Sequence, residues 1–204
     1  MRAEPIPLFP LNVVLLPGAQ LPLHIFEPRY REMVRDCLVA KSCFGMVLAT
    51  EDGVAGVGCT TEITELVRRY DDGRMDILTV GRRPFRVLEF FTQDPLMRAR
   101  VEYLEDEEDV VDNAVRSRLM ELYEVCYTIA FETFPKELTL TDEIFLSYAV
   151  SEALPIDLLW KQQILELRSE PERQARLTGY LRGWAPHLQK LKVARAGASG
   201  NRLN

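Results

Sequence analysis

Residues 6–30 read IPLFPLNVVLLPGAQLPLHIFEPRY, and this stretch decides how the first half of the chain folds. Four prolines between positions 7 and 22 exclude a helix, because proline lacks a backbone N–H and clashes with the preceding turn. The apolar runs Asn12 to Leu16 and Gln20 to Phe26 are therefore predicted to be short strands, either bulged or at a sheet edge. Pro17-Gly18 between them is typical of a turn.

Four further segments of the first hundred residues have strand patterns. Phe44 to Thr50 is apolar and β-branched enough for a buried strand. Thr60 to Tyr70 and Arg74 to Val80 flank Asp72-Gly73, which predicts a hairpin because glycine tolerates the left-handed backbone of a tight turn. From Met97 to Tyr103 apolar and charged residues alternate, so we expect one face in a core and the other in water.

Helical periodicity interrupts this pattern once and then replaces it. In Glu27 to Lys41 the apolar residues recur at i, i+3, i+4, i+7 and i+8, and Pro28 suits the first turn of a helix. A long amphipathic pattern runs from Val111 to about Pro135. Three more helices are predicted after it, the first capped by Thr141 or Asp142, the second opened by Pro155 and the third starting near Ser169.

Strands followed by helices predict an α+β fold, not an alternating α/β one. The acidic run from Glu105 to Asp109 separates the two kinds of pattern. Because like charges repel and resist burial, we expect this run to be solvated and the boundary to lie within Glu105 to Asn113. The predicted organisation is a β-rich unit over residues 1–106, a helical unit over 107–193 and a flexible tail over 194–204.

The overall charge argues against a nucleic-acid partner. The 204 residues carry a formal net charge of −6, and their arginines are scattered through the sequence. Proteins that grip nucleic acid usually gather Lys and Arg on one face. The apolar stretches are too short and too interrupted for a membrane span, which needs about 20 residues. We therefore predict a cytoplasmic protein that binds neither nucleic acid nor membrane.

Catalytic and metal-binding motifs are missing from the sequence. The four cysteines form no C-x-x-C pair and the two histidines lie far apart, so neither a metal site nor a structural disulfide is expected. No phosphate loop, G-x-S-x-G elbow or H-E-x-x-H helix occurs. The glycines of residues 53–58 have the wrong spacing for a dinucleotide loop and are interpreted as a turn between strands. His24 has no neighbouring nucleophile and is interpreted as a partly buried structural histidine. The prediction is a non-enzyme without cofactors.

The N-terminal string resembles the opening signature of the Lon protease N-terminal domain. The resemblance is closest in IPLFPL (6–11), VVLLPG (13–18) and LPLHIFEPRY (21–30). Cys59 and Thr60 depart from the family pattern in a later strand, and Pro84 departs from it in another. The further pieces that match, in the family's order, are GVGC (56–59) with EI (62–63), DGR (72–74), GRRPFRV (81–87), and in the helical half Pro155, Lys161-Gln162, Leu165-Glu166 and Arg173.

The resemblance implies a β-rich pseudo-barrel with one inserted helix, followed by a C-terminal helical bundle. It also implies recognition of unfolded or damaged polypeptides, in protein quality control linked to proteolysis. Since the phosphate loop of the Lon ATPase is missing, we expect a free-standing recognition module or adaptor without catalytic residues. Two alternatives stay open at this point. One is a scaffold for one specific folded partner, and the other is an enzyme whose site is assembled from distant residues.

An apolar cleft or an open strand edge of the barrel is the expected place for a bound peptide, because main-chain hydrogen bonds are blind to sequence. Strand alternation puts Phe90 and Phe91 on opposite faces, so one of them is a candidate contact, and the flexible Met97 lies nearby. Phe26 and Tyr30 are interpreted as core anchors, with Glu27 and Arg29 as an ion pair. The predicted peptide-binding residues are Phe85, Phe90, Phe91 and Met97.

Overall fold

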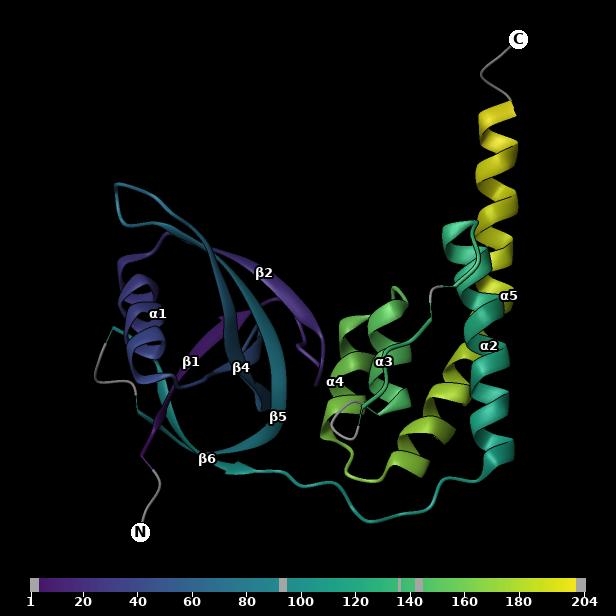
Figure 1. Ribbon diagram of the computed structural model, residues 1–204. Coiled ribbons are helices and arrows are strands. Elements are labelled where there is room, and N and C mark those ends of the chain that lie inside the picture. The colour runs from purple at the N-terminus through teal and green to yellow at the C-terminus, as the bar shows by residue number, and fades with distance from the viewer. Residues whose placement is uncertain (1–3, 92–94, 136, 142–144, 201–204) are drawn as a thin grey trace. The chain divides into compact units, whose positions relative to one another are not determined.

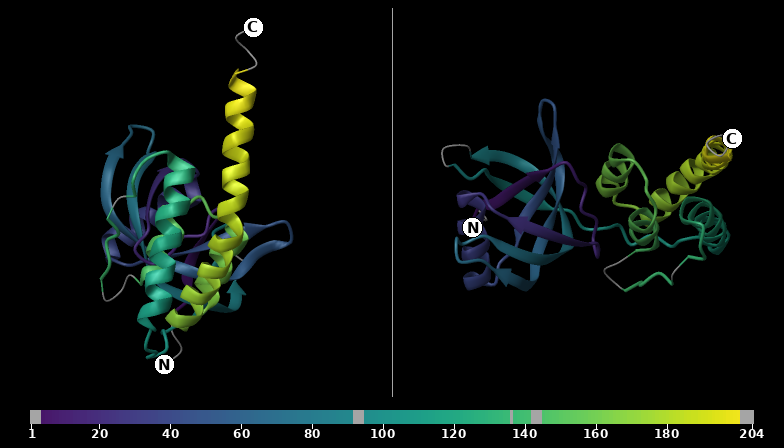
Figure 2. Two further views of the ribbon diagram at one scale, coloured as in Figure 1. Left: turned by 90° about the vertical axis from the view of Figure 1, so that its right-hand side faces the viewer. Right: turned by 90° about the horizontal axis from the view of Figure 1, so that it is seen from above.

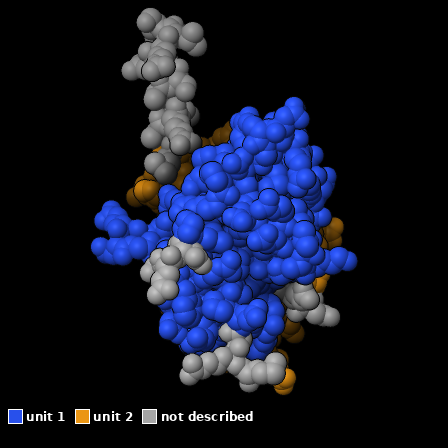
Figure 3. Space-filling model, turned by 90° about the vertical axis from the view of Figure 1, so that its left-hand side faces the viewer, with its two compact units in different colours: residues 1–105, 158–166 blue, residues 106–157, 167–204 orange. Residues whose placement is uncertain are grey.

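The computed structural model describes residues 4–91, 95–135, 137–141 and 145–200. The chain divides into two compact units, shown in Figures 1 and 3. Unit 1 comprises residues 1–105 and 158–166, and unit 2 comprises residues 106–157 and 167–204. This division differs from the predicted one at Asp106, which belongs to unit 2, and at residues 158–166, which belong to unit 1 although they fall inside the predicted helical unit.

Unit 1 contains one mixed sheet in the order β2-β5-β4-β3-β1-β6. β5 pairs with β6 as well, so five strands close into a ring and β2 extends the sheet beside β5. The closure depends on strand length, because the 17 residues of β5 pair first with β2 and then with β6. This is the predicted α+β pseudo-barrel. Its strands are β1 (Ile6–Leu11), β2 (Gln20–Ile25), β3 (Phe44–Thr50), β4 (Gly53–Arg69), β5 (Met75–Phe91) and β6 (Arg98–Tyr103).

β1 contains two prolines although it lies between two other strands. It pairs with β6 at Ile6 and Pro7 and with β3 from Leu8 onward, and the Leu8 amide donates to the Met97 carbonyl at 2.8 Å. Successive amides of a strand point to opposite edges. Pro7 therefore faces the β3 side before that ladder begins, and Pro10 faces the β6 side after that ladder has ended. Each proline takes a position where no ladder hydrogen bond is lost.

The predicted strand at residues 12–16 is wrong. The segment lies between β1 and β2 without regular pairing, and its apolar side chains fill the core. An apolar run shows that a segment is buried, whereas a strand also needs a partner in register. The buried side chains are Val14, Leu15 and Leu16.

Helix α1 (Pro28–Ala40) confirms the predicted inserted helix. It begins with Pro28 in its first turn and ends at Lys41, whose φ of 50° is left-handed. The ring of Tyr30 packs edge-on against Phe9, with ring centroids 4.2 Å apart. Tyr30 is thus a core anchor as predicted, but Phe26 is not, since 60% of its surface is exposed.

The hairpin of β4 and β5 confirms the turn predicted at Asp72-Gly73, and Gly73 has a φ of 85°. Its tip projects beyond the rest of the barrel (Figures 1 and 2). Residues 53–58 were interpreted as a turn, and this was wrong because β4 already begins at Gly53. Gly58 is needed there for packing, since a Cβ at this position would lie 2.3 Å from the Met46 carbonyl oxygen. A glycine-rich sequence can therefore mark close packing of strands as well as a turn.

Unit 2 is built from helices, and one further helix, α4, packs in unit 1. The Asp112 side chain caps α2 by accepting a hydrogen bond from the Ala114 amide at 2.7 Å. Of the two predicted caps of α3, Thr141 is not the N-cap, which is Phe145, and Asp142 lies outside the described residues. The segment predicted as a flexible tail is helical up to Gly200. The helices are α2 (Asn113–Phe131), α3 (Leu146–Ala153), α4 (Leu158–Glu166) and α5 (Glu170–Gly200).

An ion-pair network at the core of unit 2 includes part of the acidic run. Arg173 is fully buried and reaches Asp106 at 2.5 Å and Glu170 at 3.0 Å. Tyr148 lies against the same guanidinium, with 4.4 Å from the Arg173 Cζ to its ring centroid. The expectation that the whole acidic run is solvated was therefore wrong at Asp106, whose side chain is only 15% exposed. A buried arginine needs carboxylate partners, and Asp106 of the acidic run is one of them.

No helix formed by the described residues is both long enough and apolar enough to cross a membrane.

Candidate functional site

Phe85, the first of the predicted peptide-binding residues, does not lie on a surface. Its side chain is completely buried in a cluster with Leu8, Val47 and Ala99. Its ring fills the space left by glycines, because a Cβ on Gly58 would come within 2.7 Å of the Phe85 ring. The prediction that Phe85 contacts a peptide is therefore corrected, since a side chain inside the barrel cannot meet a client.

Phe90 and Phe91 lie on opposite faces of the β5–β6 ladder. Phe90 is the cross-strand partner of the buried Ala99, so it is on the inner face, at the end of the sheet, where 43% of its surface remains exposed. Phe91 pairs with Arg98 on the outer face. It is half-buried, and the Arg100 guanidinium lies 5.4 Å from its ring centroid.

Next to Phe90, one edge of β5 is open. The β4–β5 ladder ends at Arg86, whereas the β5–β6 ladder continues to Phe91. Within the described part of the chain, the other edge of β5 therefore has no strand beside it after Arg86. Leu88 on this edge is 58% exposed, and Met97 of the adjoining segment packs partly against the core cluster. We name this region the β5 edge surface, made of Leu88, Phe90, Phe91 and Met97.

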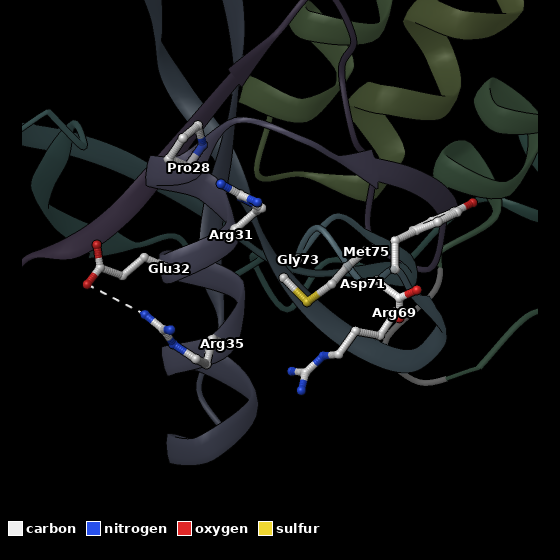
Figure 4. Close-up of a pocket in the computed structure, with 9 residues that line it drawn as sticks. Pro28, Arg31, Glu32, Arg35, Arg69, Asp71, Gly73 and Met75 are labelled. Atoms are coloured by element: carbon white, nitrogen blue, oxygen red, sulfur yellow. Dashed lines mark ion pairs between the residues drawn. The ribbon is translucent and has the colours of Figure 1, made fainter.

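A second surface feature of unit 1 is a cleft between helix α1 and the tip of the β4–β5 hairpin (Figure 4). Its volume is about 460 Å³. One wall comes from the first two turns of α1 and the other from the ends of β4 and β5, so tertiary folding alone brings them together. We name it the α1–hairpin cleft. It is lined by Pro28, Arg31, Glu32, Arg35, Arg69, Tyr70, Asp71, Gly73 and Met75.

Hydrogen bonds centred on Asp76 hold the hairpin wall of this cleft in place. Its carboxylate accepts from the Tyr70 hydroxyl at 2.7 Å and lies 2.5 Å from Nδ1 of His24. The hydrogen bond with His24, followed by the one from Tyr70, lowers the pKa of Asp76. The same bond to Asp76 raises the pKa of Tyr70. His24 is exposed, not partly buried as predicted, and it serves a structural role as a partner of Asp76.

Aromatic rings extend from the cleft along the surface. The rings of Tyr70 and His24 have centroids 5.8 Å apart, and those of His24 and Phe26 are 6.1 Å apart. Because Asp76 fixes both His24 and Tyr70, this row is preorganised. Phe26, which resembled a core anchor in the sequence, is its exposed end.

Three arginines of the cleft keep charge available for a ligand. Arg31 donates to the main-chain carbonyl of Asp72 at 2.5 Å, and it forms no direct ion pair with the Asp72 carboxylate, which is engaged by Arg74. Arg35 has only a loose contact of 3.6 Å with Glu32, and both side chains are exposed. Arg69 forms no ion pair with any residue in the described ranges. In Figure 4, the Arg69 side chain extends from the hairpin wall toward α1.

Metal ligands and reactive thiols were not expected from the sequence. Among the described residues, no group of three or more His, Cys, Asp or Glu side chains has a geometry that could hold a metal ion. The described cysteines are free thiols, and three of the four are buried.

Sequence reasoning missed the exposed Leu88 and the whole α1–hairpin cleft. The only sequence signal for the cleft is the spacing of Arg31 and Arg35, which places both on one side of a helix, one turn apart. The opposing Arg69 is distant in sequence, so no local pattern could reveal it. The ion pair predicted between Glu27 and Arg29 is confirmed at 2.8 Å.

Comparisons with known proteins agree on one family. The chain is 25% identical over 206 residues to a Lon protease of Dictyoglomus thermophilum, covering 94% of the chain and 25% of that protein. It is 37% identical over 108 residues to the protein cereblon of Xenopus tropicalis, covering 50% of the chain and 24% of that protein. The chain spans a quarter or less of the length of the curated relatives it matches.

A solved structure shares the fold over most of the chain. The crystal structure of a Lon N-terminal domain protein from Xanthomonas campestris matches with a TM-score of 0.69 and 25% sequence identity. The match covers 87% of this chain and 99% of that one. The family model of the ATP-dependent protease La (LON) substrate-binding domain matches residues 5–183. Since that match includes the barrel and most of the helical unit, the chain belongs to the family of the ATP-dependent protease La (LON) substrate-binding domain.

Proposed function

We propose that this chain recognises polypeptide segments that lack stable structure, acting as a substrate-recognition module or adaptor without catalysis of its own. The β5 edge surface is the contact region. The observation that carries the proposal is the open edge of β5, where Leu88 is 58% and Phe90 is 43% exposed.

An open strand edge suits a client of variable sequence. An extended segment can add to such an edge by main-chain hydrogen bonds, which do not depend on side-chain identity. Leu88 and Phe90 then supply apolar contact, and Met97 adapts to side chains of different shape because its thioether chain is flexible. Phe91 lies on the opposite face of the ladder and contributes at the rim. Phe85 has no part in this surface.

Family membership supports the same reading. The matching family model describes a substrate-binding domain, and several similar curated proteins are Lon proteases. Those proteins are at least four times as long as the part that this chain matches, so their activity is not carried over. We expect the purified chain to hydrolyse no ATP and to degrade no casein, because its sequence contains no phosphate loop and no G-x-S-x-G or H-E-x-x-H motif.

Fluorescence anisotropy with one labelled protein, in its native state and in a reduced, unfolded state, tests the proposal. We expect the unfolded form to bind with micromolar affinity, which corresponds to about −8 kcal/mol. The double variant Leu88→Ser/Phe90→Ser should bind at least about tenfold more weakly, since apolar anchors carry most of the energy of such contacts. Val39→Ser removes another exposed apolar side chain, 82% exposed on α1, and should leave binding unchanged.

Two results would count against the proposal. Negligible binding of both forms would remove polypeptide recognition and favour the scaffold alternative. Unchanged binding by Leu88→Ser/Phe90→Ser, with an intact thermal unfolding transition, would show that the β5 edge surface is not the contact.

A scaffold for one folded partner is the second candidate, favoured by exposed aromatic side chains of unit 2. Phe134 is 86% and Phe131 is 46% exposed at the C-terminal end of α2. Exposed aromatic residues are typical anchors of protein–protein contacts. A partner that binds wild-type protein but not Phe131→Ser/Phe134→Ser, while unfolded clients bind both equally, would support this role.

A further inference from the structure

We propose that the α1–hairpin cleft binds an extended polypeptide segment with acidic side chains at alternate positions. This inference deepens the proposed recognition of polypeptides and rests on it. It assigns to the cleft a preference for charge that the apolar β5 edge surface does not have.

The charge balance of the cleft is the first step. The whole chain has a formal net charge of −6, yet guanidinium groups outnumber carboxylates here. The nearby Asp72 and Asp76 are already engaged, Asp72 by Arg74 at 2.7 Å and Asp76 by Tyr70 at 2.7 Å. Only two carboxylates line the cleft beside its three arginines, and they are Glu32 and Asp71.

The surroundings of Tyr70 add to the positive charge of the hairpin wall. The guanidinium carbons of Arg68 and Arg74 lie 4.6 Å and 5.0 Å from the Tyr70 ring centroid. Cation–π contact holds both groups in place, and because Asp72 balances the charge of Arg74, the added positive charge comes from Arg68. An anionic ligand that enters the cleft therefore meets positive charge on the hairpin side as well as on α1.

The spacing of the arginines indicates which carboxylates fit. Arg31 and Arg35 are four residues apart on α1, which is about 6 Å along the helix axis. In an extended segment, side chains two positions apart lie on the same side with a spacing of about 6.6 Å. Two acidic side chains at alternate positions therefore match these two arginines, and Arg69 reaches toward them from the opposite wall. Arginine suits this task because its planar fork binds carboxylates in a bidentate manner.

The cleft also has an apolar floor that suits polypeptide more than nucleic acid. Pro28, the Tyr70 ring and the almost fully buried Met75 line the cleft together with the charged residues, and the first two can pack against the methylene groups of glutamate. Glu32 and Asp71 would repel a nucleic acid, because its backbone carries a phosphate at every nucleotide. A peptide with only two carboxylates can place them next to the arginines and away from Glu32 and Asp71.

Binding of fluorescein-labelled peptides with blocked termini to the full chain tests this inference. The first peptide carries two glutamates separated by one serine in a serine- and glycine-rich segment. A second has the same composition with the glutamates adjacent, and a third has glutamine in place of glutamate. We expect the first to bind at least about threefold tighter than the second, because only alternate side chains share one face of an extended segment. The third should bind weakest.

Variants of the chain identify the cleft as the site. Arg35→Gln/Arg69→Gln should weaken binding of the first peptide about tenfold, since each exposed ion pair contributes modestly. Arg86→Gln removes an exposed arginine of β5 and should change nothing. Glu32→Gln should strengthen binding about twofold, because it frees Arg35 and removes a repelling charge. Arg31 is left unchanged in these variants, since it also holds the hairpin tip.

The outcomes separate this inference from the proposed function. Loss of preference for alternate glutamates, or unchanged binding by Arg35→Gln/Arg69→Gln, overturns the inference while the binding of an unfolded protein at the β5 edge surface stands. Tighter binding of an oligothymidylate of equal charge would replace the acidic segment by a nucleic acid. A peptide that binds only with a free C-terminal carboxylate would replace internal acids by a chain end. Conversely, loss of unfolded-protein binding with intact acidic-peptide binding refutes the proposed function alone.

Discussion

Arg173 is completely buried, and its charge is balanced by side chains of unit 2. Two carboxylates, Asp106 and Glu170, lie within 3.0 Å of its nitrogens, and Ser147 Oγ accepts from its Nε at 3.0 Å. Its Nη1 also donates to the Leu167 carbonyl at 2.9 Å. An ion taken out of water is tolerable only when its hydrogen-bonding groups are satisfied. This residue therefore connects the acidic run to α5.

Replacing Arg173 by alanine should strongly destabilise unit 2. The change leaves Glu170 buried without its cation and Asp106 with only Arg168 at 3.3 Å, which costs about 3–5 kcal/mol. Urea unfolding followed by circular dichroism measures it. Arg176 lies on the same helix and forms an exposed ion pair with Glu172. The control variant Arg176→Ala should therefore lower the free energy of unfolding by less than about 1 kcal/mol. Equal effects of the two changes would contradict the network.

Tyr148 makes the stability of unit 2 sensitive to alkaline pH. Burial raises the pKa of Tyr148 to about 12 in the folded chain, against about 10 in an unfolded one. Below pH 10 the phenol is protonated in both states and the stability is unaffected. Between pH 10 and 12 only the unfolded state releases the proton, so stability falls by about 2–3 kcal/mol.

Urea unfolding at pH 9 and pH 12 measures this loss in the wild-type chain and in Tyr148→Phe. The phenylalanine variant has no titrating phenol at this position, so its stability should fall less over the same interval. Other buried tyrosines titrate in both proteins and cancel in the comparison. An identical fall in the free energy of unfolding of both proteins would show that ionisation of Tyr148 does not destabilise the folded state.

At the scale of elements, the barrel depends on close approach of β3 and β4. Gly58 lies against β3 so tightly that a Cβ would meet Val47 Cγ1 at 2.8 Å as well as the Met46 carbonyl. The space is shared with the ring of Phe85. Gly56 lies in the same strand, but a Cβ there meets no atom within 4 Å among those described. The two glycines look alike in sequence and differ in what surrounds them.

Gly58→Ala should destabilise unit 1 by about 2–3 kcal/mol, because the methyl group forces β3 and the Phe85 ring apart. Gly56→Ala should be neutral or up to about 1 kcal/mol stabilising, since alanine loses less backbone entropy on folding. Thermal unfolding of both variants measures the difference. A stable Gly58→Ala protein would mean that β3 and β4 can separate without loss of packing.

At the scale of the whole molecule, the chain passes between the units three times. It leaves unit 1 after residue 105, returns for α4 at residue 158 and leaves again after residue 166. Within unit 1, the Gln162 side chain of α4 donates to the Val57 carbonyl of β4 at 3.0 Å. A helix from late in the sequence thus completes a unit built from its beginning. Each unit is compact by itself, but neither is formed by one continuous stretch of the sequence.

A cut in the acidic run should therefore not separate the two parts of the chain. Glu107 and Glu108 are exposed outside any helix or strand, so a glutamate-specific protease should cleave there first. The fragments should elute together in gel filtration, because α4 on the second fragment stays packed on β4 in the first. Gln162→Glu places a carboxylate against the Val57 carbonyl and should promote separation. The exposed Gln163→Glu should not. If the fragments of the cleaved wild-type chain elute separately, the packing of α4 on β4 does not hold them together.

Much of the fold could be predicted from the sequence because it depends on local pattern. The period of α1, the alternation before Tyr103 and the Asp72-Gly73 turn each involve residues close in the chain. The opposite faces of Phe90 and Phe91 follow from strand geometry alone. The resemblance to the family could be recognised in residues 6–30 for a similar reason, since this motif is local in the sequence.

What only the tertiary structure decided involves residues far apart in the chain. Phe85 and Phe90 are equally apolar, and only barrel closure buries the first and leaves the second at an open edge. Helix α4 looked like part of a helical bundle, and its burial against β4 assigns it to the barrel. Arg69 lies across the cleft from α1 because folding places the tip of the β4–β5 hairpin next to this helix. Sequence pattern reports which side chains avoid water, whereas the partner that covers each of them is set by the closing of the chain on itself.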